Sequence, residues 1–305
     1  METRVIVIVG PTCSGKTLLS LNLALKLKSE IISADSRQVY KYLDIGTAKP
    51  TSEQLNLVKH HFVSSIQPDE NFNASKFSDE AEIVVRNLLS NDKIPVVVGG
   101  SGLYIKALID GIIVDVETDE KYRAELYELR KNKGNEFLYE KLKAIDPESA
   151  SKMLPQNWKR IIRALEVYHL SEKPLSYFYS KQKKKDEFNY LQFGLEWNRS
   201  ELYQNINQRV DNMIENGFVE EVKNILAKGY DRSLNSLNTV GYKEIISFLE
   251  NKISLEEAIL KIKKNTRNYA KRQLTWFKKD KRIKWISISD IDQIEKISNE
   301  IFNSI

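Results

Sequence analysis

Cysteine and histidine are scarce in this sequence. The 305 residues include a single cysteine, Cys13, and three histidines, His60, His61 and His169. One cysteine cannot form an internal disulfide, and it does not combine with these histidines into the usual Cys/His zinc pattern. The shortage excludes a disulfide-stabilised secreted domain and a structural zinc site.

Long apolar runs are also missing. The longest, Val5–Val9 and Ile94–Val98, fall far short of the ~20 residues that a membrane-spanning helix needs. The N-terminus passes from one arginine straight into a β-branched stretch, without the apolar segment and cleavage site of a signal peptide. We therefore expect a cytoplasmic protein that has no contact with a membrane.

Glycine and proline are few as well, at 12 and 7 residues. Together with 41% hydrophobic and 29% charged residues, these numbers exclude collagen-like, disordered and low-complexity chains. At the usual ~150 residues per domain, the chain is long enough for about two folded domains with cores of their own.

Positive charge is unevenly placed along the chain. The 47 Lys and Arg residues exceed the 42 Asp and Glu residues by only five. Residues 261–284, however, hold eleven of the cations and one acid, Asp280, and residues 181–185 hold four more cations. Such blocks suit a polyanionic partner such as nucleic acid, although for a lysine run alone a solvated helix face is the commoner explanation.

Short β-branched runs alternate with helical patterns over residues 1–117. The runs RVIVIVG, EIISAD and IPVVVGG predict strands, and the segments between them predict helices, as in a parallel sheet. From residue 118 to about 187 helical spacing alone remains. Residues 188–197 predict a further strand, long amphipathic helices follow it, and a last strand in IKWISIS closes the pattern.

A phosphate-binding motif follows the first predicted strand. The stretch GPTCSGKT, residues 10–17, matches G-x-x-x-x-G-K-[ST] ahead of a helical pattern. Its glycines let backbone N–H groups surround phosphate oxygens, Lys16 adds a positive charge, and Thr17 can ligate Mg²⁺. Cys13 fits this loop as a small tolerated side chain better than as a catalytic thiol. The predicted fold is α/β: a P-loop NTPase-like parallel-sheet core, residues 1–117 and 188–305, with an inserted helical domain, residues 118–187.

A P-loop alone favours a nucleotide or metabolite kinase, and an RNA-binding GTPase is a further possibility. Neither neighbouring strand ends as a Walker B strand would, because VVV runs into Gly99, Gly100 and Ser101. Asp35 is the acid best placed at a strand end. Because the carboxyl ends of parallel strands form the ligand crevice, Asp35, the P-loop and Ser101 should converge there. For Asp35 a helix-capping role or a simple Mg²⁺-ligand role is the alternative.

Nine stretches occur along the chain in this order: GPTCSGKT, ADSRQVYKYLDIGTAKP, HHF, VVVGGSGLYIKAL, KRIIRALEVY, EKPLS, RVDNMIENGFVEEV, TVGYKE and TRNYAKRQLTWFKK. The series resembles the tRNA dimethylallyltransferase family, also called tRNA isopentenyltransferases. The match is to the bacterial type, which lacks the C-terminal zinc finger of the eukaryotic relatives. Ser101 stands where many members have threonine, which keeps the hydroxyl.

The resemblance implies transfer of a dimethylallyl group from dimethylallyl diphosphate to the exocyclic amine of the adenosine 3′ of the anticodon, with release of diphosphate. The P-loop then holds the prenyl donor instead of ATP. This amine is a weak nucleophile, and Asp35 can accept its proton as the new bond forms. Ser101 can hydrogen-bond the bridging oxygen or the amine, and a helix N-cap is its alternative role.

The remaining site residues are expected as follows. The diphosphate is held by Gly10, Thr12, Cys13, Ser14, Gly15, Lys16, Thr17 and, by resemblance, Arg209, with Mg²⁺ on Thr17. The anticodon stem-loop of tRNA is contacted by Asp35, Ser36, Arg37, Gln38, Ser101, Arg123, Lys159, Arg160, Ile161, Ile162, Arg163, Arg267, Lys271 and Arg272. For Arg123 and Arg163 a salt bridge on an exposed helix is an equal alternative, and His60 and His61 are expected to pack or hydrogen-bond near the core. We expect the protein to act as a monomer.

Overall fold

The computed structural model describes residues 3–111, 116–181 and 187–305. It divides into two compact units, one of Met1–Ile109 with Asp186–Ile305, called the core unit below, and one of Asp110–Lys185, called the insertion unit. The basic run at 181–185 lies, apart from Lys181, outside the described residues. Within the described residues, no helix is both apolar enough and long enough to cross a membrane.

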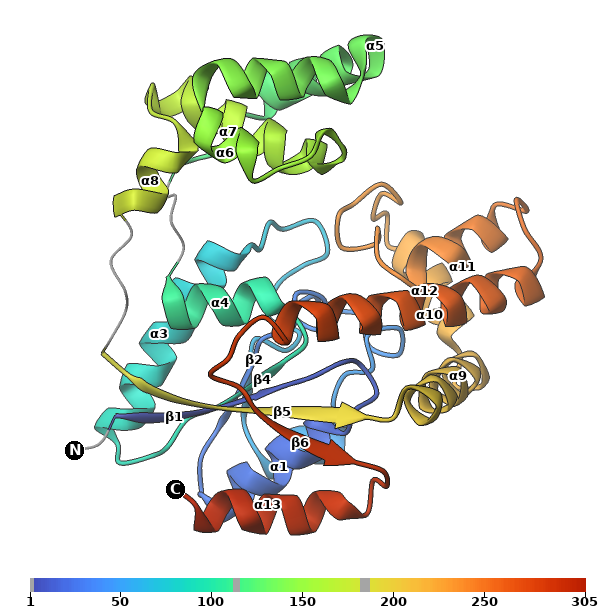
Figure 1. Ribbon diagram of the computed structural model, residues 1–305. Coiled ribbons are helices and arrows are strands. Elements are labelled where there is room, and N and C mark those ends of the chain that lie inside the picture. Colours follow the sequence, from blue (N-terminus) through green and yellow to red (C-terminus); the bar gives the residue numbers. More distant parts are fainter. Residues whose placement is uncertain (1–2, 112–115, 182–186) are drawn as a thin grey trace. The chain divides into compact units, whose positions relative to one another are not determined.

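A six-stranded parallel sheet forms the centre of the core unit (Figure 1). Its strands are β1 (Arg4–Val9), β2 (Ile31–Ser33), β3 (His60–His61), β4 (Val96–Gly99), β5 (Asn189–Trp197) and β6 (Lys284–Ile288), in the spatial order β3-β2-β4-β1-β5-β6. Strand β1 pairs with β4 on one side and with β5 on the other, so that Ile8 is opposite Val98 and Phe193. The segment between β4 and β5 that contains the insertion unit therefore begins and ends at strands that flank β1.

Helices cover both faces of this sheet. The helices of the core unit are α1 (Lys16–Lys26), α2 (Ser52–Leu57), α3 (Ala74–Ser90), α4 (Gly102–Asp110), α9 (Arg199–Glu215), α10 (Phe218–Ala227), α11 (Tyr242–Leu249), α12 (Leu255–Phe277) and α13 (Gln293–Asn303). Alternate residues of β1 point to opposite faces: Val5 and Val7 pack with α3, α4 and α12, whereas Ile6 and Ile8 pack with α1 and α13. Burial on both faces explains why the strand is apolar without interruption.

The five strands predicted from β-branched runs are present, and the fold class is confirmed. Two elements differ from the prediction. The strand in IKWISIS is not the last element of the fold, because the helix α13 follows it. Ile294, Ile297 and Ile301 of α13 pack on the same face of the sheet as α1. His60 and His61 form the short edge strand β3, where the His61 ring nitrogen Nε2 lies 2.7 Å from a carboxylate oxygen of Glu30.

The insertion unit is helical. It contains α5 (Glu120–Ile145), α6 (Pro147–Ser151), the 3₁₀ turn η1 (Pro155–Asn157), α7 (Trp158–Ser171) and α8 (Leu175–Lys181), and α5 is kinked where Gly134 has φ 82°. Leu126, Leu138 and Leu142 of α5 pack against Ile161 and Leu165 of α7 to form a separate core. Asp146 ends α5 and caps α6 by accepting a hydrogen bond from the Ser149 N–H.

Candidate active site

The P-loop connects the end of β1 to the start of α1. Gly10, Cys13 and Gly15 all have positive φ, at 149°, 63° and 87°, so the loop turns sharply before Lys16 begins the helix. A side chain at position 10 would also place its Cβ 2.9 Å from the carbonyl oxygen of Leu195 on β5. The strand, loop and helix order leaves the unpaired N–H groups of the first turn of α1 available for an anion.

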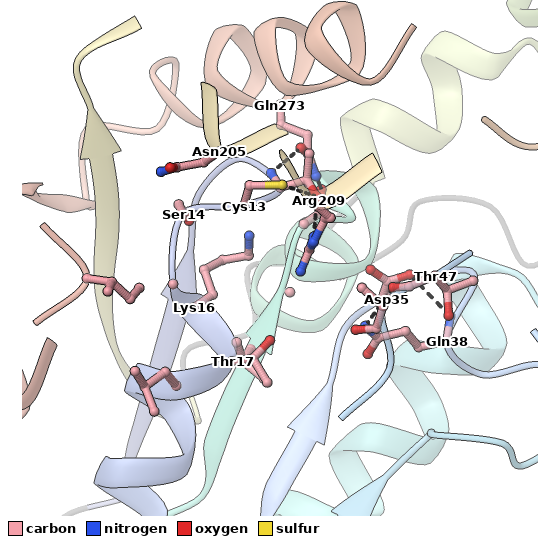
Figure 2. Close-up of a pocket in the computed structure, with 18 of the residues that line it drawn as sticks. Cys13, Ser14, Lys16, Thr17, Asp35, Gln38, Thr47, Asn205, Arg209 and Gln273 are labelled. Carbon is pink, nitrogen blue, oxygen red and sulfur yellow. Dashed lines mark hydrogen bonds between the residues drawn. The ribbon is translucent and has the colours of Figure 1, made fainter. Parts of the chain in front are cut away.

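A cleft of about 740 Å³ lies at the carboxyl ends of the strands, and the P-loop forms one of its walls (Figure 2). Asp35 and Gln38 line it from the segment after β2, and the helices α9 and α12 contribute Arg209 and Tyr269. The sequence-predicted residues that the cleft brings together are Thr12, Cys13, Ser14, Gly15, Lys16, Thr17, Asp35, Gln38 and Arg209. Gly10 lies at the base of the loop, and Ser36, Arg37 and Ser101 do not line the cleft.

Two cations face the P-loop. The Arg209 guanidinium donates a 3.0 Å hydrogen bond to the Thr12 hydroxyl, and Figure 2 shows Lys16 pointing into the same space. Burial, followed by the nearby positive charge of Arg209, lowers the pKa of Lys16 to about 8. A bound polyanion would oppose this lowering, because it supplies negative charge where two cations have been brought together. The charge and the free N–H groups of this wall suit an anion such as a di- or triphosphate.

Asp35 forms the opposite wall, two residues after Ser33, the last residue of β2. Its Oδ1 accepts hydrogen bonds from the N–H groups of Arg37 at 2.8 Å and Gln38 at 3.3 Å, which orient the carboxylate. The Ser101 hydroxyl oxygen accepts from the Ser36 N–H at 3.0 Å, and the Ser101 carbonyl accepts from the first turn of α4. Ser101 thus holds the backbone of Ser36, the residue after Asp35, and directly precedes α4. Arg37 extends to the carbonyl of Asn235.

Gln273 of α12 was not predicted as a site residue. Its side-chain oxygen accepts from the Thr12 N–H at 2.8 Å, and its nitrogen donates to the Gly100 carbonyl at 2.9 Å, so it joins the P-loop to the end of β4. A Cβ at Gly100 would come within 2.1 Å of this side chain, and one at Gly102 within 2.2 Å of Trp276. The glycines after β4 therefore permit α12 to approach closely. The signal for Gln273 was its spacing with Ala270 and Phe277, which places it on the buried face of the helix.

In the insertion unit the predicted RNA contacts have different environments. Arg123 and Arg163 both pair with the fully buried carboxylate of Glu166, at 2.7 Å and 2.6 Å. Ile161 and Ile162 are buried in the core of the unit and present no side-chain surface to RNA. Lys159 and Arg160 are exposed. The two arginines thus form an ion-pair cluster around a buried carboxylate, whereas the alternative considered from the sequence was a salt bridge on an exposed helix.

The basic segment on α12 also divides. Arg267 donates to the Asn207 side chain at 2.6 Å, Lys263 pairs with Asp211 at 2.6 Å, and Lys278 pairs with Glu196 at 2.5 Å. Lys271 and Arg272 are exposed. These two cations are the part of the predicted tRNA contact on α12 that the surface presents most openly.

A phosphate-binding wall that faces an oriented carboxylate suits a reaction in which a donor leaves its phosphate on the P-loop while the carboxylate takes a proton from the acceptor. Fold and site together place the chain in the class of P-loop-type α/β transferases. The family model described as IPP transferase matches residues 38–280. The chain belongs to this family, and it is therefore a prenyltransferase.

Alignments with similar proteins extend over nearly the whole chain. A tRNA dimethylallyltransferase of Thermoanaerobacter sp. (strain X514) is 44% identical, over 99% of this chain and 97% of that protein. Among solved structures, the full-length tRNA isopentenylpyrophosphate transferase of Bacillus halodurans is 38% identical with a TM-score of 0.72, over 99% of this chain and 96% of that one. A eukaryotic dimethylallyltransferase acting on tRNA is 28% identical with a TM-score of 0.83, over 100% of this chain and 80% of that one. The comparisons do not support the kinase alternative.

Proposed function

We propose that this protein transfers a dimethylallyl group from dimethylallyl diphosphate to the exocyclic amine of the adenosine 3′ of the anticodon in tRNA, and releases diphosphate. The observation that carries the proposal is the single cleft in which the P-loop and Arg209 face Asp35. The similarity to tRNA dimethylallyltransferases supports the choice of donor and acceptor. Because one chain supplies both walls, we expect a monomer to be sufficient.

The donor lies on the P-loop wall in this proposal. Departure of diphosphate concentrates negative charge beside Lys16, Arg209 and the N–H groups of α1, and each preorganised donor of this kind contributes about 2.7 to 4 kcal/mol. No three His, Cys, Asp or Glu side chains gather as a metal cluster in the described part of the chain. Mg²⁺ nevertheless fits, because it is commonly held by one or two protein oxygens together with substrate phosphates and water, and Thr17 lines the cleft with its hydroxyl. When bound, the ion would neutralise charge on the leaving group.

The acceptor lies on the Asp35 wall. The target adenine is stacked in the anticodon loop, so it has to leave the stack to reach the cleft, at an expense of a few kcal/mol. The Asp35 carboxylate then accepts the proton of the amine as the bond to the allylic carbon forms, and the fixed N–H groups of Arg37 and Gln38 hold that carboxylate in place. Ser101 does not line the cleft, so it acts through the Ser36 N–H, from which its hydroxyl oxygen accepts a hydrogen bond.

Binding of the rest of the tRNA falls to exposed cations. Lys271 and Arg272 on α12 and Lys159 and Arg160 on α7 are exposed, so that phosphates can reach them. Arg267, Arg123 and Arg163 would have to exchange their present partners for RNA. We therefore expect the exposed four to supply most of the salt-dependent affinity.

The proposal is tested with labelled dimethylallyl diphosphate and an unmodified anticodon stem-loop. We expect label on the RNA, and none when the adenosine 3′ of the anticodon is replaced by guanosine, which carries a carbonyl oxygen at position 6 in place of the reacting amine. ATP serves as the rival ligand and should compete only weakly. Tighter binding of ATP than of the prenyl donor, with phosphate release stimulated by a small metabolite, would replace this proposal with a kinase.

A further inference from the structure

Three of the stretches noted in the sequence meet at a place that the reaction does not explain. Glu221, in the first turns of α10, accepts hydrogen bonds from the backbone N–H groups of Asp44 at 3.0 Å, Ile45 at 2.6 Å and Gly46 at 3.1 Å. The Tyr242 hydroxyl, from α11, donates a fourth bond at 2.6 Å. Successive N–H groups that converge on one carboxylate form an anion nest, here filled by the protein's own side chain.

The loop at 44–46 also lies directly on two aromatic rings. Phe218 and Tyr242 pack edge to face, with ring centroids 5.1 Å apart. A Cβ at Gly46 would come within 2.2 Å of the Phe218 ring and 2.6 Å of the Tyr242 ring. Glycine is therefore required for the backbone to reach Glu221, and the loop is held by contact from below as well as by hydrogen bonds.

The same loop continues into the active-site cleft. Thr47 and Ala48 line the cleft, and their carbonyl oxygens each accept a 3.2 Å hydrogen bond from the Gln38 side-chain nitrogen. The Gln38 backbone N–H donates in turn to the Asp35 carboxylate at 3.3 Å. Figure 2 shows Gln38 reaching between Asp35 and Thr47. Hydrogen bonds, joined by the backbone of residues 44–48 and by Gln38 itself, thus link α10 to the carboxylate that faces the P-loop.

We propose that Glu221 is a positioning residue for the acceptor wall: it fixes residues 44–48, which orient Gln38 and through it Asp35. The inference rests on the proposed function for its chemistry but not for its geometry. Glu221 does not line the cleft, and its hydrogen bonds described above go to the loop at 44–46 and to Tyr242. Its loss should therefore slow transfer while leaving the diphosphate wall intact.

The test compares Glu221→Gln with Glu220→Gln. Glu220 is the neighbouring residue on α10, is exposed, and pairs only at the surface with Lys223, so its variant has the same charge change in a neutral place. A glutamine at 221 turns an NH₂ group toward donors that need an acceptor. We expect the single-turnover transfer rate of Glu221→Gln to fall on the order of 100-fold, the effect of a displaced reacting group. Binding of inorganic pyrophosphate should remain at the Glu220→Gln value.

Hydrogen exchange supplies a readout that does not depend on activity. The amides of Asp44, Ile45 and Gly46 should exchange faster in Glu221→Gln, and those of the P-loop should not. If Glu221→Gln does not fold, Tyr242→Phe replaces it in the test. This variant removes one of the four donors to Glu221 and keeps the three backbone bonds, and we expect its transfer rate to fall several-fold. Equal transfer rates for Glu221→Gln and Glu220→Gln, below the melting temperatures of both, would overturn the inference. Failure of the unaltered protein to transfer the group would refute the proposed function instead, while the exchange data still decide the role of Glu221 in the loop.

Discussion

The two walls of the cleft are built in different ways. The P-loop wall is built mainly from contiguous residues, with its shape set by positive φ angles at Gly10, Cys13 and Gly15, and Arg209 and Gln273 join it at Thr12. The Asp35 wall depends on partners far along the chain, since Ser101, the loop at 44–48 and Glu221 all hold it. The difference means that damage to one wall should leave the other largely unaffected, so donor binding and acceptor chemistry can be separated by mutation.

The largest expected effect is at the Asp35 wall. Asp35→Asn keeps an oxygen for the Arg37 N–H but removes the proton acceptor, so kcat should fall on the order of 10² to 10⁴. Affinity for tRNA should stay within a few-fold of the unaltered protein, as measured by filter binding. A single-turnover rate near that of the unaltered protein would show that Asp35 is not the base.

A smaller loss is expected at the P-loop wall. Lys16→Met removes one preorganised cation and should lower kcat by about 10² to 10³. Unlike Asp35→Asn, it should also weaken binding of pyrophosphate, measured by calorimetry. Lys26→Met, at the exposed end of the same helix, is the matched control. Equal pyrophosphate affinity for the two lysine variants would contradict the assignment.

The lowered pKa of Lys16 makes the donor wall sensitive to pH. Burial and Arg209 lower this pKa to about 8, so Lys16 is charged below that pH and loses its charge as pH rises through it. Pyrophosphate binding should weaken above about pH 8, and binding there should take up a proton because the anion raises the pKa again. Calorimetry in buffers of different ionisation enthalpy measures the uptake.

Pyrophosphate titrates as well, so the comparison is with Lys16→Met, in which the ligand's own contribution remains. The difference in proton uptake between the two proteins isolates Lys16. Identical uptake by both would mean that Lys16 keeps its charge throughout this range.

The smallest effect on turnover is expected from α12. Replacing Arg267, Lys271 and Arg272 with Ala should make the slope of log K against log[salt] for tRNA shallower by up to about two units. Because Arg267 is held by Asn207, the Lys271→Ala, Arg272→Ala double variant should produce most of this change. Lys296→Ala, on the exposed side of α13, is a control. An unchanged slope, with or without a lower melting temperature, would remove the RNA role of these cations.

The sequence predicted best what local chemistry determines. GPTCSGKT appears as a strand, loop and helix because glycine φ angles and the Lys-Thr start of α1 are properties of adjacent residues. The β-branched runs became strands for the same reason. Asp35 was located because a strand end in a parallel sheet has a defined place in the fold.

What the sequence did not predict depends on contacts between distant residues. Gln273 was grouped with a basic RNA-binding segment, although it joins the P-loop to β4. Glu221 lies in the stretch RVDNMIENGFVEEV, but it was assigned no chemical role from the sequence. Most of its partners are backbone N–H groups, which the amino-acid sequence does not distinguish from other backbone groups. Arg123 and Arg163 were predicted to contact RNA. In the structure each forms a salt bridge with the buried carboxylate of Glu166, a contact that the sequence pattern does not reveal. The helix α13 was not predicted either, although Ile294, Ile297 and Ile301 have the spacing of an amphipathic helix.

The most direct test of the two-wall account is a structure of this chain with a non-reacting thiodiphosphate analogue of the donor and an unmodified anticodon stem-loop. The account predicts diphosphate oxygens against Lys16 and Arg209. It also predicts the exocyclic amine of an unstacked adenine within about 2.6 to 3.2 Å of an Asp35 carboxylate oxygen. An analogue bound away from the P-loop, or an adenine whose amine faces away from Asp35, would contradict it.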